Sequence, residues 1–153
     1  MEETLQTLID RVAIRELVDT YARGADRRDA VLEASAFAAD GEVEVYEGGP
    51  HGREPVQRVR GRDALVRTFA ELIERYEATT YLNGQSSVRF LTADEAEGET
   101  YCLALHLVQD GGERYLLTMS IRYLDRFVKE GGRWAIASRR LVFDWTDRRP
   151  SEP

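Results

Sequence analysis

His106 lies in one of the most apolar stretches of the chain, YCLALHLV, which runs from Tyr101 to Val108. An imidazole has an unperturbed pKa of about 6.5, so a small environmental shift lets it take or return a proton near neutral pH. A buried histidine can equally be a neutral ring held by one hydrogen bond, and this structural interpretation stays open. The catalytic interpretation requires a partner, usually a carboxylate, that orients the ring.

Three aspartates that follow the first helical segment are candidates for this carboxylate: Asp26, Asp29 and Asp40. Asp40 precedes a glycine, as turn residues do, and Asp29 occupies the position of a helix N-cap. Asp26 has neither local explanation, and it follows a helix that would cross the mouth of a cavity. A solvated loop charge remains the structural alternative. Asp26 is therefore the residue that we expect to pair with His106.

The elements that must position these residues follow from hydrophobic periodicity. Helical spacing covers residues 5–21, 29–38 and 61–77, with Gly24 as the expected exit of the first helix. Alternation typical of strands covers residues 42–46, 80–91, 99–109, 114–128 and 133–145. Helices followed by an antiparallel meander indicate an α+β fold. Long twisted strands in such a meander curl into a cone or half-barrel, and the N-terminal helices would close a deep apolar pocket.

Length and composition limit the classes of function. The 153 residues suit one domain, with a core at about residues 5–145 and a loose tail at 146–153. The net charge is −7 and no basic cluster is present, which argues against nucleic acid. No signal peptide or membrane span is recognisable, so we expect a cytoplasmic protein without a membrane partner. The two histidines lack close ligand spacing, and no phosphate-binding glycine loop is present, so neither a metal nor a cofactor is expected.

The strand that contains His106 is apolar on both faces. His106 shares one face with small residues, which suits a cavity. The other face carries Tyr101, Leu103, Leu105 and Leu107. Because neither face should meet bulk water, we expect a homodimer, or a trimer, through the outer face of the sheet.

Four segments in order carry a resemblance to a known family: IRELVDTYARGADRRD with FAADGEVEV, then GRDALVRTF, then AEGETYCLALHL, then YLDRFVKEGGRWAIASRRLVFDW. Together they resemble the SnoaL-like branch of the nuclear-transport-factor-2-like superfamily, from about Leu5 to Trp145. The resemblance implies a curled antiparallel sheet that helices close into a cone with a deep pocket.

Within this branch, the site resembles that of the scytalone dehydratase, bile-acid 7α-dehydratase and lindane dehydrochlorinase group. The resemblance implies that Asp26 is the catalytic aspartate and that His106 is a second pocket histidine. It implies a pocket tyrosine at Tyr46, which would polarise a carbonyl through water, and a pocket arginine at Arg139. The main catalytic histidine of the group falls at Tyr81 here. A tyrosine is a poor base at neutral pH, but it can donate a hydrogen bond to a developing oxyanion.

Further residues on the same strand faces would form an apolar, aromatic chamber, unless they are plain core: Met119, Ile121, Tyr123, Val108 and Phe143. Such a chamber suits a hydrophobic, cyclic or polycyclic small molecule. The leading hypothesis is therefore a cofactor-independent acid–base enzyme. Elimination of water, double-bond isomerisation and ring closure all begin with proton abstraction next to a carbonyl, which this residue set could perform.

Two alternatives stay open. An epoxide hydrolase needs paired carboxylates around an arginine, and Asp26, Asp125 and Arg139 could supply them. A non-catalytic binding module is the other alternative, and the tyrosine at position 81 favours it. His51, in the loop GGPHGREP, could reach over the pocket mouth as part of a lid.

Overall fold

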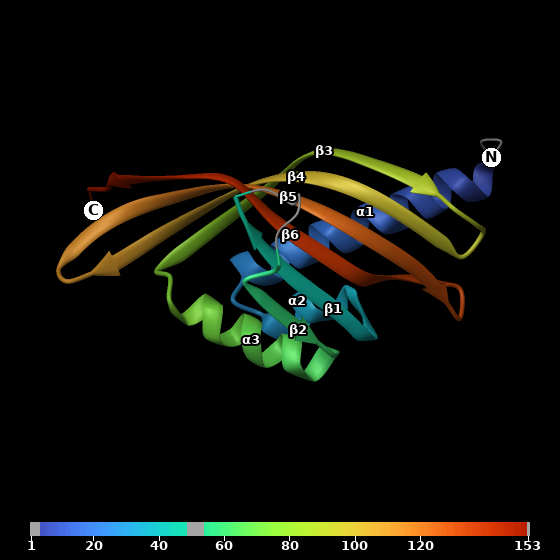
Figure 1. Ribbon diagram of the computed structural model, residues 1–153, viewed down its shortest axis with the longest axis horizontal. Coiled ribbons are helices and arrows are strands. Elements are labelled where there is room, and N and C mark those ends of the chain that lie inside the picture. Colours follow the sequence, from blue (N-terminus) through green and yellow to red (C-terminus); the bar gives the residue numbers. More distant parts are fainter. Residues whose placement is uncertain (1–3, 49–53, 153) are drawn as a thin grey trace.

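The computed structural model describes residues 4–48 and 54–152 of the chain (Figure 1). Its helices are α1 (Leu5–Asp26), α2 (Ala30–Ser35) and α3 (Arg62–Glu74). Its strands are β1 (Phe37–Glu47), β2 (Gln57–Arg60), β3 (Ala78–Phe90), β4 (Glu95–Asp110), β5 (Glu113–Glu130) and β6 (Arg133–Pro150). The helices and the long strands match the sequence periodicity, except that Phe37 and Ala38, predicted at the end of a helix, are the first residues of β1. The short strand β2 was not predicted, because four residues between two loops carry too little pattern.

The six strands form one sheet in the order β2-β1-β6-β5-β4-β3. β3 to β6 make the antiparallel meander that the sequence predicts. β1 pairs parallel to β6, with Val45 opposite Leu141, so the sheet is mixed rather than purely antiparallel. The reason is topological: α3 and the meander separate β1 from β6 in the chain, so no tight hairpin forces the two strands to run in opposite directions.

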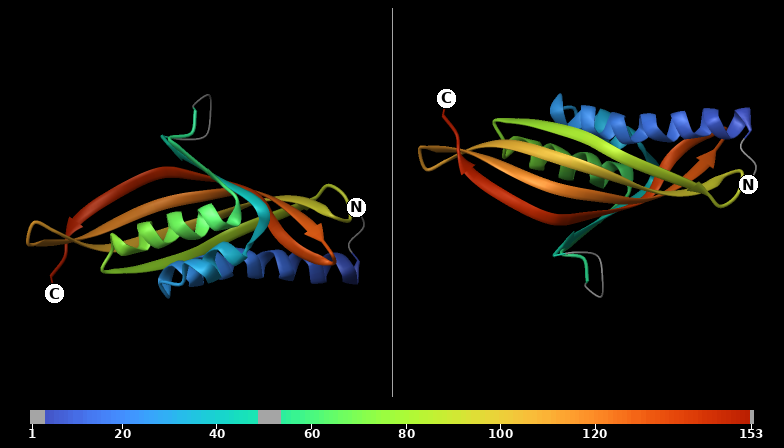
Figure 2. Two further views of the ribbon diagram at one scale, coloured as in Figure 1. Left: turned by 90° about the horizontal axis from the view of Figure 1, so that it is seen from below. Right: turned by 90° about the horizontal axis from the view of Figure 1, so that it is seen from above.

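The long strands curl over the three helices without closing into a barrel (Figure 1). β5 carries two irregularities, at Ser120/Ile121 and Arg126/Phe127, and bulges of this kind increase local twist and bend a strand. The two views of Figure 2 show α3 across the concave face of the sheet and α1 alongside β3. The sheet and helices therefore make the half-cone that the sequence indicated, with an enclosed inner face and an open outer face.

The long helix α1 begins at the N-cap Thr4, whose side chain accepts a hydrogen bond from the Thr7 nitrogen. Only its second half buries an apolar stripe, at Ile14, Val18 and Tyr21. The earlier apolar residues of the predicted stripe are exposed: Leu5, Leu8, Ile9 and Val12. None of the helices in the described part of the chain is long and apolar enough to cross a membrane.

Burial along β4 follows the predicted alternation. Cys102, Ala104 and His106 are buried on the inner face, whereas Tyr101 and Leu103 are exposed on the outer face. β6 continues to Pro150, whose Cα lies opposite that of Tyr115 in β5. The structure thus places residues 146–150 in a strand, where the sequence indicated a loose tail, because β5 is long enough to supply partners for them.

Candidate functional site

A cavity of about 330 Å³ lies between the helices and the concave face of the sheet. It draws on every helix and every strand, which explains why no single segment of the sequence reveals it. Its lining residues are Tyr21, Ala25, Glu33, Val45, Glu47, Val56, Gln57, Phe69, Leu72, Ile73, Arg75, Tyr76, Thr79, Tyr81, His106, Met119, Ile121, Leu141 and Phe143. Most of these are apolar or aromatic, and a few are polar, as is typical of sites for small organic ligands.

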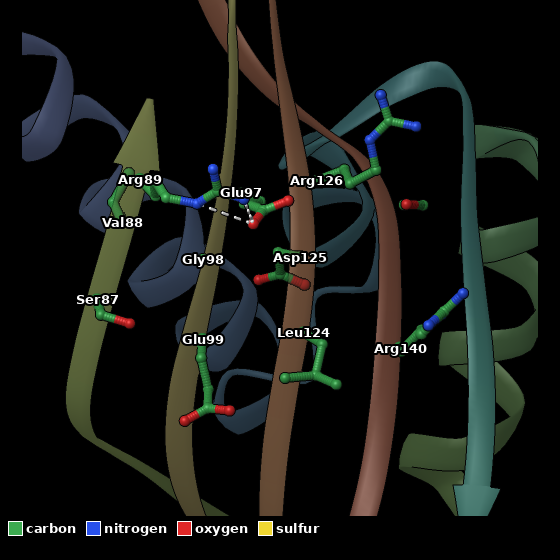
Figure 3. Close-up of a pocket in the computed structure, with 11 residues that line it drawn as sticks. Ser87, Val88, Arg89, Glu97, Gly98, Glu99, Leu124, Asp125, Arg126 and Arg140 are labelled. Atoms are coloured by element: carbon green, nitrogen blue, oxygen red, sulfur yellow. Dashed lines mark hydrogen bonds and ion pairs between the residues drawn. The ribbon is translucent and has the colours of Figure 1, made fainter. Parts of the chain in front are cut away.

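A second hollow, of about 580 Å³, lies on the outer face over β3 to β6 (Figure 3). It is open and rich in charged side chains, and some of these already pair across the strands. Arg89 binds Glu97, and Arg126 lies 3.9 Å from Glu95. Among the described residues, this hollow and the inner cavity have no lining residue in common. Exposed ion pairs of this kind are common on open sheets, so the inner cavity is the candidate site.

His106 and Tyr81 meet at the wall of the inner cavity. The Tyr81 hydroxyl lies 3.2 Å from Nε2 of His106, whose side chain is 2% exposed. Burial lowers the pKa of His106 to about 4, although nearby backbone groups of Leu117 and Ala104 oppose this shift. Nδ1 makes no hydrogen bond within the described residues. Burial also raises the pKa of Tyr81, so the hydroxyl keeps its proton and can donate a hydrogen bond to Nε2 of the neutral imidazole when that nitrogen is unprotonated.

Asp26 is the last residue of α1, and its side chain forms hydrogen bonds with β3 rather than with His106. Its carboxylate accepts hydrogen bonds from Oγ1 of Thr79 at 3.0 Å and from the nitrogen of Tyr81 at 3.1 Å. Burial raises its pKa, and these two hydrogen bonds partly offset that shift. No hydrogen bond joins Asp26 to His106 in the described part of the chain. The direct pair that the sequence predicted is therefore wrong for this geometry: both residues meet Tyr81, at different atoms.

Glu33 is a cavity residue that the sequence interpretation missed. Its side chain is 4% exposed, and its Oε2 has no hydrogen-bond partner within residues 4–48 and 54–152. Burial raises its pKa to about 8, against the opposing effects of Arg139 and of a hydrogen bond from Tyr21. At neutral pH the group is mostly a carboxylic acid, which can donate a hydrogen bond inside the cavity.

Gly24 holds Glu33 in this position. A side chain at Gly24 would place its Cβ 2.6 Å from Cα of Glu33 and 2.7 Å from its Cβ. The Gly24 oxygen also accepts from the nitrogen of Asp29, which caps α2 through the nitrogen of Leu32. Gly24 is thus an interior residue of α1, whereas the sequence indicated the end of the helix. A glycine is needed at this position because α2 approaches it closely. A glycine followed nine residues later by a glutamate was the available signal, but it is a weak one.

Arg139 and Asp125 form a buried ion pair beneath the cavity. Nε and Nη2 of Arg139 donate to the Asp125 carboxylate at 2.8 Å each, and both side chains are almost fully buried. The guanidinium stacks on the rings of Tyr21 and Tyr123, at 4.3 and 3.9 Å from their centroids. Neither charged residue lines the cavity, and no interaction joins Arg139 to Asp26 within the described residues. The arrangement expected for an epoxide hydrolase is therefore not present.

Tyr46 points away from the cavity. Alternation along β1 places Val45 and Glu47 on the cavity face and Tyr46 on the outer face, with Glu44. The Tyr46 hydroxyl donates to Oε2 of Glu44 at 2.7 Å. The implied role of Tyr46 as a pocket tyrosine is therefore wrong, and the alternation of EVEVY already contained the reason.

The apolar residues predicted for the chamber divide into two groups. Met119, Ile121 and Phe143 line the cavity. Tyr123 and Val108 lie on the inner face but are buried outside the cavity lining, Tyr123 against Arg139 and Val108 towards the end of β4. The predicted lid residue His51 lies outside the described residues. Among residues 4–48 and 54–152, no group of three or more side chains could hold a metal ion.

Comparison with known proteins supports the same architecture. A model of the SnoaL-like domain matches residues 6–140. A scytalone dehydratase-like protein from Novosphingobium aromaticivorans superposes with a TM-score of 0.79 at 23% identity, over 97% of this chain and 95% of that one. A hexachlorocyclohexane dehydrochlorinase from Novosphingobium barchaimii gives 0.80 at 19% identity, over 97% and 98%. A Mycobacterium tuberculosis protein of unknown function gives 0.73 at 25% identity, over 90% and 73%. No curated protein matches the sequence.

Proposed function

Because the chain belongs to the SnoaL-like domain family, we propose that it is a cofactor-independent acid–base enzyme for an uncharged, hydrophobic, cyclic molecule. The observation that carries this proposal is the Tyr81–His106 pair at the wall of an otherwise largely apolar cavity. A neutral imidazole and a protonated phenol are the acceptor and the donor that proton abstraction next to a carbonyl requires.

In the proposed reaction, the ligand carbonyl takes the hydrogen bond of the Tyr81 hydroxyl, which releases Nε2 of His106. Nε2 then accepts the proton from the carbon next to the carbonyl, and the electron pair moves to the carbonyl oxygen. His106 is a weak base in this buried position because burial disfavours its charged form. The developing enolate beside it favours the imidazolium and raises its pKa during the step. Asp26 fixes the backbone of Tyr81 and acts as a positioning residue.

Loss of a β-hydroxyl, return of the proton at another carbon, or attack on a second carbonyl would complete a dehydration, an isomerisation or a cyclisation. All three share the first proton transfer, so that transfer is the step to test. The probe is 2-tetralone in deuterated buffer, whose exchange of α-hydrogen for deuterium is followed by NMR.

The wild-type protein is expected to accelerate this exchange. His106→Ala and Tyr81→Phe should each reduce the acceleration by roughly 10²-fold or more, the usual contribution of a positioned proton-transfer group. Asp26→Asn should reduce it less, because an amide oxygen can still accept from Tyr81. Tyr115→Phe, outside the cavity lining, is the matched control. Exchange at the wild-type rate in both His106→Ala and Tyr81→Phe would refute the mechanism.

A non-catalytic binding module is the second candidate. This function is favoured because, within the described residues, no carboxylate forms a hydrogen bond with Nδ1 of His106. An imidazole that is weakly basic and has no partner to orient it is a poor catalyst. Binding of 2-tetralone by the wild type without faster exchange would support this function.

A further inference from the structure

Glu33 brings a buried carboxyl oxygen without a described partner to the wall of the cavity. A carboxyl that only stabilises the fold is expected to have both oxygens hydrogen-bonded, because burying an unsatisfied polar atom costs free energy. Oε2 of Glu33 has no partner among the described residues, and the side chain lines the same cavity as Tyr81 and His106. Close packing also fixes the position of Glu33, because Gly24 has no side chain and so allows the backbone of α2 to approach α1 at Glu33.

The groups around Glu33 explain why it stays uncharged. Arg139 from β6 is the cation that acts on it, but Asp125 already holds that guanidinium in a bidentate pair. From α1, Tyr21 donates a hydrogen bond and Asp26 adds a like charge, which opposes ionisation.

The described groups that β3 and α3 turn towards the inside of the cavity are uncharged. From β3, Tyr81 presents a phenol that keeps its proton. α3 turns an apolar face inward, formed by Leu65, Phe69 and Ile73. Glu47 from β1 and Arg75 after α3 also line the cavity, but both are exposed to solvent and neither is among the groups that shift the pKa of Glu33. Among the described residues, the one cation that favours the carboxylate form of Glu33 is therefore Arg139.

We propose that Glu33 determines the substrate class of the cavity: its carboxylic acid donates a hydrogen bond to an oxygen of an uncharged ligand, and the cavity rejects ligands that carry a carboxylate. This inference rests on the proposed function, because it requires the cavity to take a small hydrophobic molecule. Glu33 supplies a second hydrogen-bond donor beside Tyr81, so carbonyl or hydroxyl compounds fit. A ligand carboxylate next to Glu33 would meet a largely apolar wall, because Arg75 is at the exposed end of α3 and Arg139 is already paired with Asp125.

The first experiment compares two probes of similar shape, 2-acetylnaphthalene and 2-naphthoate, by calorimetric titration at pH 6.5. The wild type should bind the ketone at least tenfold more tightly than the carboxylate. Glu33→Leu, which lacks the donor, should lose about tenfold in ketone affinity, the usual effect of one hydrogen bond. Glu33→Gln keeps a donor of the same shape and should retain that affinity within about threefold. Glu71→Gln, on the exposed surface of α3, is the matched control.

The second experiment uses pH, because the amide of glutamine does not titrate. Ketone affinity of the wild type should fall by about tenfold between pH 7 and pH 9, as Glu33 ionises with a pKa of about 8. In Glu33→Gln it should stay constant over this range, because Tyr81 keeps its proton throughout. The infrared carbonyl band of a buried carboxylic acid should be present in the wild type at pH 6.5, absent in Glu33→Gln, and shifted by the bound ketone.

The outcomes separate this inference from the proposed function. If the wild type binds the ketone but Glu33→Leu and Glu33→Gln match it in affinity, selectivity and pH dependence, the role of Glu33 is refuted and the proposed function stands. If the wild type binds neither probe, both are refuted. If the infrared band is missing, Glu33 is ionised and cannot be the donor.

Discussion

Tyr81 contacts His106 with its side chain and Asp26 with its backbone. The hydroxyl lies 3.2 Å from Nε2 of His106, and the nitrogen lies 3.1 Å from the Asp26 carboxylate. A change of the Tyr81 side chain therefore alters the environment of the imidazole while leaving the hydrogen bond to Asp26 in place. The two polar residues that the sequence links as a pair can in this way be perturbed separately.

The ionisation of His106 is open to direct measurement. We expect NMR titration of the imidazole nitrogens to give a pKa of about 4, because burial disfavours the charged ring. Tyr81→Phe should raise this pKa, since the lost hydrogen bond stabilised the neutral form as an acceptor. The chain has one other histidine, His51, and His51→Gln assigns the signals. A midpoint near 6.5 in the wild type would mean that the ring is hydrated, which contradicts its burial.

Glu33 should make stability depend on pH. Its folded pKa of about 8 lies above the ordinary value of 4.5, so the folded state binds the proton more tightly than the unfolded state. The stability that this provides is complete below about pH 4.5 and is lost as pH rises through 8, by a few kcal/mol in total.

The corresponding measurement is urea unfolding of the wild type and of Glu33→Gln at pH 5 and pH 8.5. The wild type should lose stability relative to the variant at the higher pH. His106 acts in the opposite sense, since its lowered pKa removes stability as pH falls from about 6.5 to 4, but this contribution cancels between the two proteins. Equal pH dependence of the two proteins would show that Glu33 titrates normally.

Gly24 should be intolerant of any side chain. Gly24→Ala would place a methyl group 2.6 Å from Cα of Glu33, so α2 must move away from α1. We expect a loss of about 2–4 kcal/mol in unfolding free energy, of the size seen for overpacking or more. Gly84→Ala is the control, because the nearest atoms to its Cβ would be at 3.8 Å. Similar stability of the two variants would argue against the close approach of α1 and α2.

The outer face of the sheet is expected to be an interface between copies of the chain, as a dimer or a trimer. Leu82, Leu103 and Trp145 are 57%, 43% and 52% exposed there, and Leu82 lies opposite Leu103 in the β3–β4 pairing. Exposed apolar patches of this kind mark interaction surfaces. Leu103→Glu should yield a monomer in analytical ultracentrifugation at micromolar concentration. Leu8→Glu, on the exposed apolar stripe of α1, should leave the assembly unchanged. A monomeric wild type would contradict this expectation.

The inward or outward orientation of a side chain was predictable from the sequence where it follows from strand alternation. The inward position of His106 follows from the small residues that share its face in β4, and the outward position of Leu103 follows from the same period. Alternation in β1 could also have shown that Tyr46 faces outward with Glu44, but the family resemblance pointed to the pocket instead. Asp29 was correctly identified as a cap of α2 because its signal lies within four residues.

By itself, the sequence determined the family, the order of helices and strands, and the side of the sheet on which His106 lies. These properties arise from the backbone period of a strand or helix, which neighbouring residues express directly. Only the tertiary structure decided that Asp26 bonds to Tyr81, that Asp125 neutralises Arg139, and that Glu33 enters the cavity. Each of these contacts depends on how closely segments that are far apart in the sequence approach one another in space. Contacts of this kind produce no periodic pattern in the sequence.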